Sequence, residues 1–206
     1  NTSIYEMCKF ICEMDVLKFR ISGIYHIVNL LEDTNITLNS EVFTYILEMI
    51  SILNIEGVIG AKKEFMYPIF GLLYAIIEKR RGINIIFSRP DFIHIISALY
   101  SHNENNIQNG IIHIISKFLD KVPLNSMSNF YPFIILLVNH LQMKDIYFRG
   151  SILKTLERIS EFYAQNFIMF IQQFCDFFMI ASVQELPLIA SIMQNILKCH
   201  GESVVS

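Results

Sequence analysis

The feature that most constrains this chain is a sequence frame that occurs five times. Each copy starts with glycine or serine and continues with apolar residues three or four positions apart, as in GIYHIVNLLED, which starts at Gly23, and GIIHIISKFLD, which starts at Gly110. The other copies start at Gly71, Ser151 and Ser191, so successive starts are 48, 39, 41 and 40 residues apart. A period close to 40 residues indicates a chain built from repeated structural units.

Within each frame, the apolar residues have the spacing of a helix with one buried face. Positions one and five after each start lie on the same side of a 3.6-residue helix, so we expect them to form a continuous core between repeats. At the small starting residue we expect a neighbouring helix to approach closely. The first column is Ile24, Leu72, Ile111, Ile152 and Ile192, and the second is Val28, Ile76, Ile115, Leu156 and Ile196.

The rest of the chain has the same periodicity. Apolar residues recur at three and four positions and almost never alternate, which predicts helices throughout. Short polar, glycine or proline stretches separate them. No glycine-rich or serine-rich linker divides the chain, so we predict one array over residues 1–206, and the start at Asn1 suggests a piece of a longer protein. The ten predicted helices are 3–12, 15–32, 39–53, 58–81, 90–101, 104–121, 127–141, 145–163, 166–181 and 184–200.

The composition limits the classes of partner. Hydrophobic residues make up 53% and charged residues 17% of the chain, against roughly 45–50% and 25% in an average soluble domain. The longest apolar run, Phe65 to Ile77, has 13 residues, whereas a membrane span needs about 20. We therefore expect no membrane partner. The net charge of −3 lacks the basic excess of nucleic-acid-binding proteins, so we expect no nucleic acid either.

The sequence contains no motif of catalytic chemistry. Phosphate-binding and dinucleotide-binding loops, zinc-protease motifs and the nucleophile elbow are all missing. The four cysteines, Cys8, Cys12, Cys175 and Cys199, form no C-x-x-C pair, so neither a zinc site nor a disulfide framework is indicated. We predict a protein of the reducing cytoplasm or nucleus that is not an enzyme and has no cofactor, metal or small-molecule substrate.

The period and the paired helices resemble those of the HEAT and armadillo families. Asp15 followed by Phe19-Arg20, and Asp145 followed by Phe148-Arg149, are similar to the HEAT second helix, where Asp and Arg commonly form a ladder of ion pairs between repeats. The alternative is an acid that favours the helix dipole beside an ordinary surface arginine. The resemblance implies an all-α, right-handed α-solenoid of about five HEAT-like helix pairs, with the second helices lining a concave face.

Two polar columns are the candidate partner-binding residues on that concave face. They lie three and seven positions after each start, side by side and away from the core. Several residues in the C-terminal half of these columns are basic, which predicts that this half binds an acidic segment of a protein partner. The alternative is that the columns are the ordinary solvated face of amphipathic helices. The first column is His26, Tyr74, His113, Lys154 and Gln194, and the second is Leu30, Glu78, Lys117, Arg158 and Lys198.

Several segments also resemble the C-terminal region of the importin-beta superfamily of nuclear transport receptors. They are Glu41–Leu53, Phe65–Phe70 with its proline, Pro90–Phe92, Met143–Arg149 and Glu161–Asn166. The resemblance implies cargo and a small GTPase on the inner surface and Phe-Gly repeats of nucleoporins between outer helices. We therefore expect a protein-binding scaffold of nuclear transport. Two alternatives stay open: a structural scaffold subunit of the phosphatase or chromosome-organising type, and, from the mean hydropathy of +0.43, a membrane-associated or coat-type protein.

Overall fold

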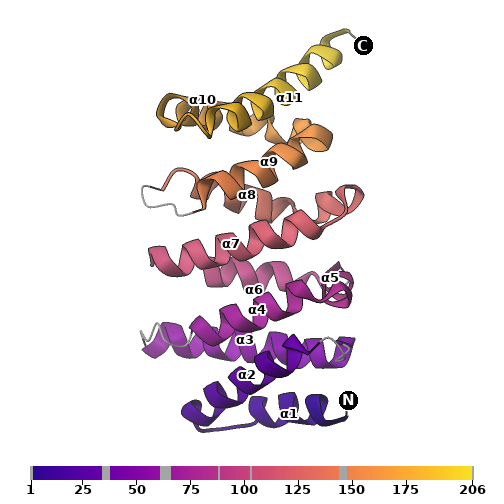
Figure 1. Ribbon diagram of the computed structural model, residues 1–206, viewed down its shortest axis with the longest axis vertical. Coiled ribbons are helices and arrows are strands. Elements are labelled where there is room, and N and C mark those ends of the chain that lie inside the picture. The colour runs from indigo at the N-terminus through magenta and orange to yellow at the C-terminus, as the bar shows by residue number, and fades with distance from the viewer. Residues whose placement is uncertain are drawn as a thin grey trace. The chain divides into compact units, whose positions relative to one another are not determined.

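A computed structural model describes residues 2–33, 38–60, 66–87, 89–102, 104–143 and 148–205 (Figure 1). These residues form helices and short connections, with no strand among them, so the predicted all-α class is confirmed. The helices are α1 (Thr2–Cys12), α2 (Leu17–Glu32), α3 (Ser40–Gly60), α4 (Met66–Glu78), α5 (Arg80–Phe87), α6 (Asp91–Tyr100), α7 (Asn105–Lys121), the 3-10 helix η2 (Leu124–Phe130), α8 (Tyr131–His140), α9 (Arg149–Tyr163), the 3-10 helix η3 (Ala164–Phe170), α10 (Ile171–Ile180) and α11 (Leu186–Val205).

The single helix predicted over residues 58–81 is wrong. Helix α3 continues to Gly60 through a predicted break at 54–57, α4 ends at Glu78, and α5 crosses the predicted break at Arg81-Gly82. One glycine costs a helix only about 1 kcal/mol, so it is a weak stop signal. Pro68 lies in the first turn of α4, where its missing N–H has no intrahelical partner to lose, so it begins a helix instead of continuing one.

Two predicted helix starts are confirmed, and both follow from local chemistry. The side chain of Asn39 accepts a hydrogen bond from the Val42 N–H at 2.8 Å, which caps α3. Helix α6 begins at Asp91, directly after Pro90. The predicted start at Asp145 lies outside the residues that the structure describes.

The chain divides into two compact units, Asn1–Ile114 and Ile115–Ser206, with the boundary inside α7. We call α1, α3, α6, α8 and α10 the first helices. We call α2, α4, α7, α9 and α11, each of which contains one repeat start, the second helices. The prediction of one array over residues 1–206 stays a prediction.

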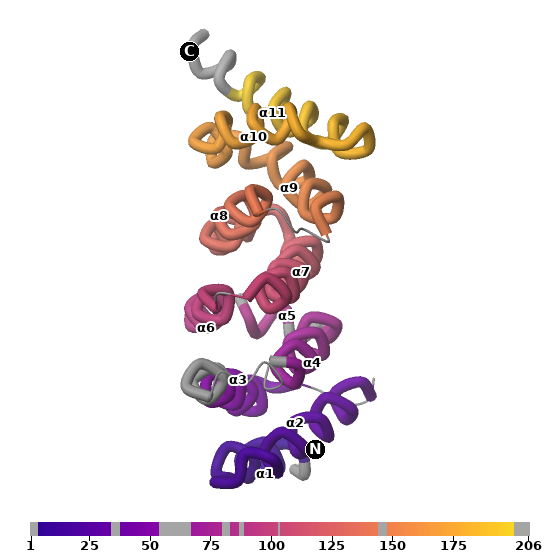
Figure 2. Tube along the Cα trace, turned by 90° about the vertical axis from the view of Figure 1, so that its left-hand side faces the viewer, coloured from indigo at the N-terminus to yellow at the C-terminus, as the bar shows by residue number. Residues whose placement is uncertain are grey.

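Within each unit, alternate helices pack on one another. In the first unit α1 contacts α3 and α3 contacts α6, while α2 contacts α4; Figure 2 shows α3 and α6 on one side and α4 on the other. In the second unit α9 contacts α11, and α7 reaches α9 through buried hydrogen bonds. Second helices thus lie next to second helices in both units, and first helices lie next to first helices in the first unit.

The core includes the columns expected from the repeats. All five residues of the first column are 0% exposed, and four of the second column are at most 1% exposed. The exception, Val28, is half-buried beside a groove described below. The prediction that these positions face the core is confirmed. Aromatic rings also join elements that follow one another, as where Phe118 of α7 meets Phe130 of η2 edge to face at 4.9 Å.

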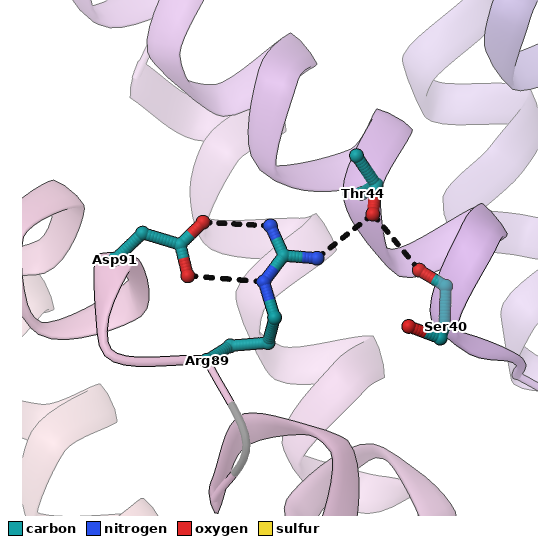
Figure 3. A network of polar contacts seen from close by, with 4 residues as sticks. All are labelled: Ser40, Thr44, Arg89 and Asp91. Carbon is teal, nitrogen blue, oxygen red and sulfur yellow. Dashed lines mark hydrogen bonds and ion pairs between the residues drawn. The ribbon is translucent and has the colours of Figure 1, made fainter.

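A polar network ties α6 to α3 in the first unit (Figure 3). The Arg89 guanidinium donates to both carboxylate oxygens of Asp91, at 3.0 and 2.6 Å, and to the Thr44 hydroxyl at 2.8 Å. Thr44 donates in turn to the Ser40 carbonyl at 3.0 Å, and the guanidinium lies 5.8 Å from the centre of the Phe43 ring. The hydrogen bonds from Arg89 lower the pKa of Asp91. The start of α6 is thereby held against the first turn of α3.

Candidate protein-binding face

The candidate residues fall into two groups, one in each unit. In the first unit, His26 is exposed on α2, and Tyr74 and His113 are half-buried on α4 and α7. In the second unit, Lys117, Lys154, Gln194 and Lys198 are exposed and Arg158 is half-buried. Every candidate therefore lies on a second helix; five of the eight side chains are exposed and three are half-buried.

In the first unit the structure brings Tyr74 and His113 together. Their ring centres lie 5.9 Å apart with an interplanar angle of 54°. Burial raises the pKa of the Tyr74 hydroxyl, which is therefore a neutral donor at physiological pH. The pair bridges two neighbouring second helices, α4 and α7.

The three glycines at repeat starts lie close to side chains of neighbouring helices. A Cβ at Gly110 would lie 2.8 Å from Cζ of Phe70 on α4, and a Cβ at Gly23 would lie 2.7 Å from Cγ1 of Ile11 on α1. At Gly71 the nearest atom, Cγ2 of Val28, would be at 3.3 Å. Ser151 and Ser191 are half-buried on α9 and α11. A larger side chain at Gly23 or Gly110 would force a neighbour to move.

A groove of about 370 Å³ lies between α2 and α4. Its walls are mainly apolar, and charged residues lie at the ends of both helices. Lys79 donates to the carbonyl of Asp33, the C-cap of α2. The lining residues are Val28, Leu31, Glu32, Gly71, Tyr74, Ala75, Glu78 and Lys79. Two residues of the predicted columns, Tyr74 and Glu78, line this groove.

In the second unit, buried hydrogen bonds join successive second helices. Thr155 and Ser116, both 0% exposed, share a hydrogen bond of 2.8 Å, and Thr155 also donates to Asp120 at 2.8 Å. Farther along, the Asn195 amide donates to the hydroxyl of Ser160, which is 0% exposed, at 2.9 Å. Sequence reasoning missed these contacts. One signal in the sequence could have indicated them. The residues four positions after each repeat start are apolar except for Thr155 and Asn195, which are polar.

These contacts also limit how the second helices are aligned. Between α7 and α9, Thr155 is bonded both to Ser116, 39 residues before it, and to Asp120, 35 residues before it, although the repeat starts differ by 41. Between α9 and α11 the partners Ser160 and Asn195 are 35 residues apart, although the starts differ by 40. The hydrogen-bonded side chains are therefore closer in sequence than equivalent positions of the repeat frame.

Arg158 has a structural contact that the sequence did not reveal. Its guanidinium donates to the carbonyl of Leu119 in the last turn of α7, where carbonyl groups lack intrahelical partners. Its Nε is buried and has no hydrogen-bond partner among the described residues. The guanidinium is therefore held in one place between α7 and α9.

The exposed face of the second unit also carries acids. Asp120 and Glu161 are exposed and lie three residues after Lys117 and Arg158, one helical turn away. Carboxylates therefore lie beside the basic residues of this face. The two polar columns alone do not reveal them.

The two arginines of the predicted ion-pair ladder have different roles. Arg20 is buried and donates to the carbonyls of Ile11 and Met14 at the end of α1, within its own helix pair. Nε of Arg149 lies 3.8 Å from Oε1 of Glu185, which joins α9 to the turn before α11. Asp145 lies outside the described residues. Arg149 therefore links successive pairs as a ladder would.

The titratable groups offer little reactive chemistry. Burial raises the pKa of both the Cys8 and the Cys12 thiol to about 12, so neither is a thiolate at neutral pH. Over the part of the chain that the structure describes, no three His, Cys, Asp or Glu side chains gather where they could hold a metal ion. Among the same residues, no helix has the length and apolar character to cross a membrane.

Comparison with known proteins leaves the family open. No protein-family model matches the chain, and no curated protein matches it. Two solved structures, both crystal structures of engineered proteins from the Northeast Structural Genomics Consortium, are similar at 11% sequence identity and a TM-score of 0.55. One match covers 96% of this chain and 90% of that protein, and the other covers 94% and 57%. At this identity the similarity shows the fold alone.

Proposed function

We propose that this chain is a protein-binding scaffold, a right-handed α-solenoid of five HEAT-like helix pairs whose second helices form the binding face. The observation that carries the proposal is the packing of second helices on second helices within each unit. Such stacking aligns equivalent positions of successive repeats into an extended surface, which repeat proteins use to bind partners.

The exposed residues of that face support a protein partner. Tyrosine and histidine in the first unit, and lysine, arginine and glutamine in the second, offer hydrogen bonds and charge. Exposed ion pairs contribute only about 0–1 kcal/mol each. A stable complex therefore needs contacts from several helices, and a stack of helices can provide them.

Site-specific photo-crosslinking tests the proposed face. A photoreactive residue at Gln194 or His26, both exposed on second helices, is expected to capture a partner protein in a lysate of the source cells. The matched control is His94, which is exposed on the first helix α6. Equal capture from control and face positions, or no capture from the face, would contradict the proposal.

More specifically, we propose a role in nuclear transport, in the cytoplasm and nucleus. The resemblance of several segments to the importin-beta superfamily supports it, and so does apolar surface on the first helix α10. Phe178, Met179 and Ile180 are 42%, 83% and 68% exposed there, and contiguous apolar surface of this kind commonly marks an interaction site. Phe-Gly repeats of nucleoporins are the partners that this role implies.

A Phe-Gly repeat peptide tests this role. We expect saturable binding by NMR titration, which Met179→Ser/Ile180→Ser abolishes. Phe162→Ser, which changes a side chain 63% exposed on the second helix α9, is the control and should leave binding unchanged. Absence of binding would remove the transport role. Recovery of the chain in a stable multisubunit complex without nucleoporins would instead favour a structural scaffold.

A further inference from the structure

The first helices of the second unit carry almost no charge. Residues 124–140, which form η2 and α8, contain no Lys, Arg, Asp or Glu, and residues 164–180, which form η3 and α10, contain one, Asp176. His140, the one histidine of these elements, is fully buried. A soluble domain of average composition has about one charged residue in four. Charge is depleted in this way at the centre of protein–protein interfaces.

A comparison of α8 with α10 shows which side chains of α10 are on the outer side. The bounds of η2 and α8 are those of η3 and α10, 40 residues earlier. Ile168, Met169 and Met179 are exposed, and so are the residues 40 positions before each of them. Ile180 is also exposed, but its counterpart in α8, His140, is fully buried. Ile168, Met169 and Met179 are therefore at positions that face solvent in both first helices.

These three apolar side chains share one side of the helix with an acid. Ile168, Met169 and Met179 are 39%, 66% and 83% exposed. Asp176 is exposed as well; it is three residues before Met179 and seven after Met169, so all three lie on one side of the helix. We call Ile168, Met169, Asp176 and Met179 the η3–α10 stripe. Methionine is flexible and polarizable, which suits it to contacts with a partner.

Asp176 is not neutralised within the described part of the chain. It forms no ion pair there, and the residues three and four positions away on either side are uncharged. Arg149 lines a small cavity together with Phe177, but its Nε lies 3.8 Å from Glu185 instead. Gln172 donates to Oδ1 of Asp176 at 3.0 Å. An ionised carboxylate has about four acceptor sites, so Asp176 can still accept hydrogen bonds from a ligand.

The charge pattern decides the class of ligand. Nucleic acids and anionic lipid surfaces are bound by Lys and Arg, and η2, α8, η3 and α10 contain neither. Insertion of the apolar side chains into a neutral membrane would take the carboxylate of Asp176 out of water without a counter-ion. A protein can supply apolar side chains and a cation together. Apolar contacts spaced by helical turns fit an amphipathic helix.

From this geometry we infer that the η3–α10 stripe is a docking site for an amphipathic helix of a partner protein that carries one Lys or Arg among its apolar residues. The cation would meet Asp176 while apolar side chains cover Met169 and Met179. The inference goes beyond the proposed binding face, because the stripe lies on η3 and the first helix α10, whereas that face lies on second helices.

NMR titration of the full chain with a helical peptide tests the inference. The probe is Gln-Leu-Ala-Gln-Lys-Ala-Gln-Ala-Leu-Ala-Gln-Leu-Ala-Gln with blocked ends, whose Lys and three Leu share one helix face. We expect saturable shifts in η3 and α10, and an affinity at least about fivefold higher than that of the same peptide with Glu in place of Lys. Met169→Ser/Met179→Ser should weaken binding about tenfold or more, because apolar contact area is lost.

Reversal of the charge on the chain is the sharper arm. Asp176→Lys should reverse the preference, so that the glutamate peptide binds more tightly than the lysine peptide. The matched control, Glu6→Lys, changes an acid that is exposed on the first helix α1 and should keep the preference for lysine. The circular dichroism spectrum of each variant verifies that the fold is kept.

Four outcomes would overturn the inference: no binding of the lysine peptide, equal affinities of the two peptides, a preference that Asp176→Lys leaves unchanged, or sedimentation of the chain with phosphatidylcholine vesicles. A failure of the proposed function is seen separately. The crosslinks from Gln194 and His26 test the second-helix face, and the Phe-Gly peptide has no charge that could discriminate between Asp176 and lysine.

Discussion

The hydrogen bond between Thr155 and Ser116 offers a quantitative test of how α7 and α9 pack. Both side chains are fully buried, and Thr155 contacts Ser116 and Asp120 at 2.8 Å each. Thr155→Val keeps the side-chain shape but leaves the Ser116 hydroxyl without this partner. An unsatisfied buried polar group costs about 1–3 kcal/mol. Asp120 is exposed, so water can replace its lost hydrogen bond. We therefore expect Thr155→Val to lower the free energy of unfolding by about 2 kcal/mol.

Ser116→Ala should cost less, about 1 kcal/mol, because Thr155 keeps Asp120 and the Ser151 carbonyl as partners. In the double variant no hydroxyl is left unsatisfied at this contact. Its loss should therefore be smaller than the sum of the single losses by about 1 kcal/mol. Urea denaturation followed by circular dichroism measures the free energy of unfolding of all three variants. The slope of this free energy against urea concentration should be the same in each variant. Additivity within about 0.3 kcal/mol would refute the direct contact.

Three further predictions concern stability. Gly23→Ala should destabilise the chain by about 1 kcal/mol or more, because the new Cβ would meet Cγ1 of buried Ile11 at 2.7 Å and overpacking exceeds the gain in helix propensity. Gly150→Ala, which has no atom within 4 Å, should instead stabilise it by up to about 1 kcal/mol; thermal denaturation of both variants decides. Burial lowers the pKa of His140 from 6.5 to about 4. As the pH falls, His140 becomes protonated in the unfolded chain before it does in the folded chain. The neutral, buried His140 therefore contributes fully to the free energy of unfolding above about pH 6.5, and this contribution is lost as the pH falls toward about 4. The loss is on the order of 3 kcal/mol. His140→Gln should reduce the difference between urea midpoints at about pH 7 and about pH 4.5, and an unchanged difference would contradict this origin.

The sequence predicted the core well because burial is encoded in periodicity. The columns headed by Ile24 and Val28 follow from the spacing of apolar residues, and nine of their ten members are buried. Helix ends were less predictable. Breakers such as Gly82 have small energies, and the effect of Pro68 depends on where its helix begins.

The positions of the candidate side chains relative to one another depend on contacts between helices. The repeat frame in the sequence gives no information about these contacts. The frame places Lys117, Arg158 and Lys198 in one column. The frame does not show which side chains of successive helices meet, as Ser160 of α9 meets Asn195 of α11. The contact of Arg158 with the end of α7 was also hidden, because the sequence does not show which carbonyl groups lie opposite a side chain.

The most direct test of the central claim, that successive second helices lie against each other in this alignment, is the nuclear Overhauser spectrum of the full chain. The Asn195 side-chain amide should show cross-peaks to Ser160 because the two groups are hydrogen-bonded at 2.9 Å. The Tyr74 ring should show cross-peaks to His113, whose ring centre is 5.9 Å away. Absence of both sets of peaks, with the resonances assigned, would contradict the stacking on which the binding face depends.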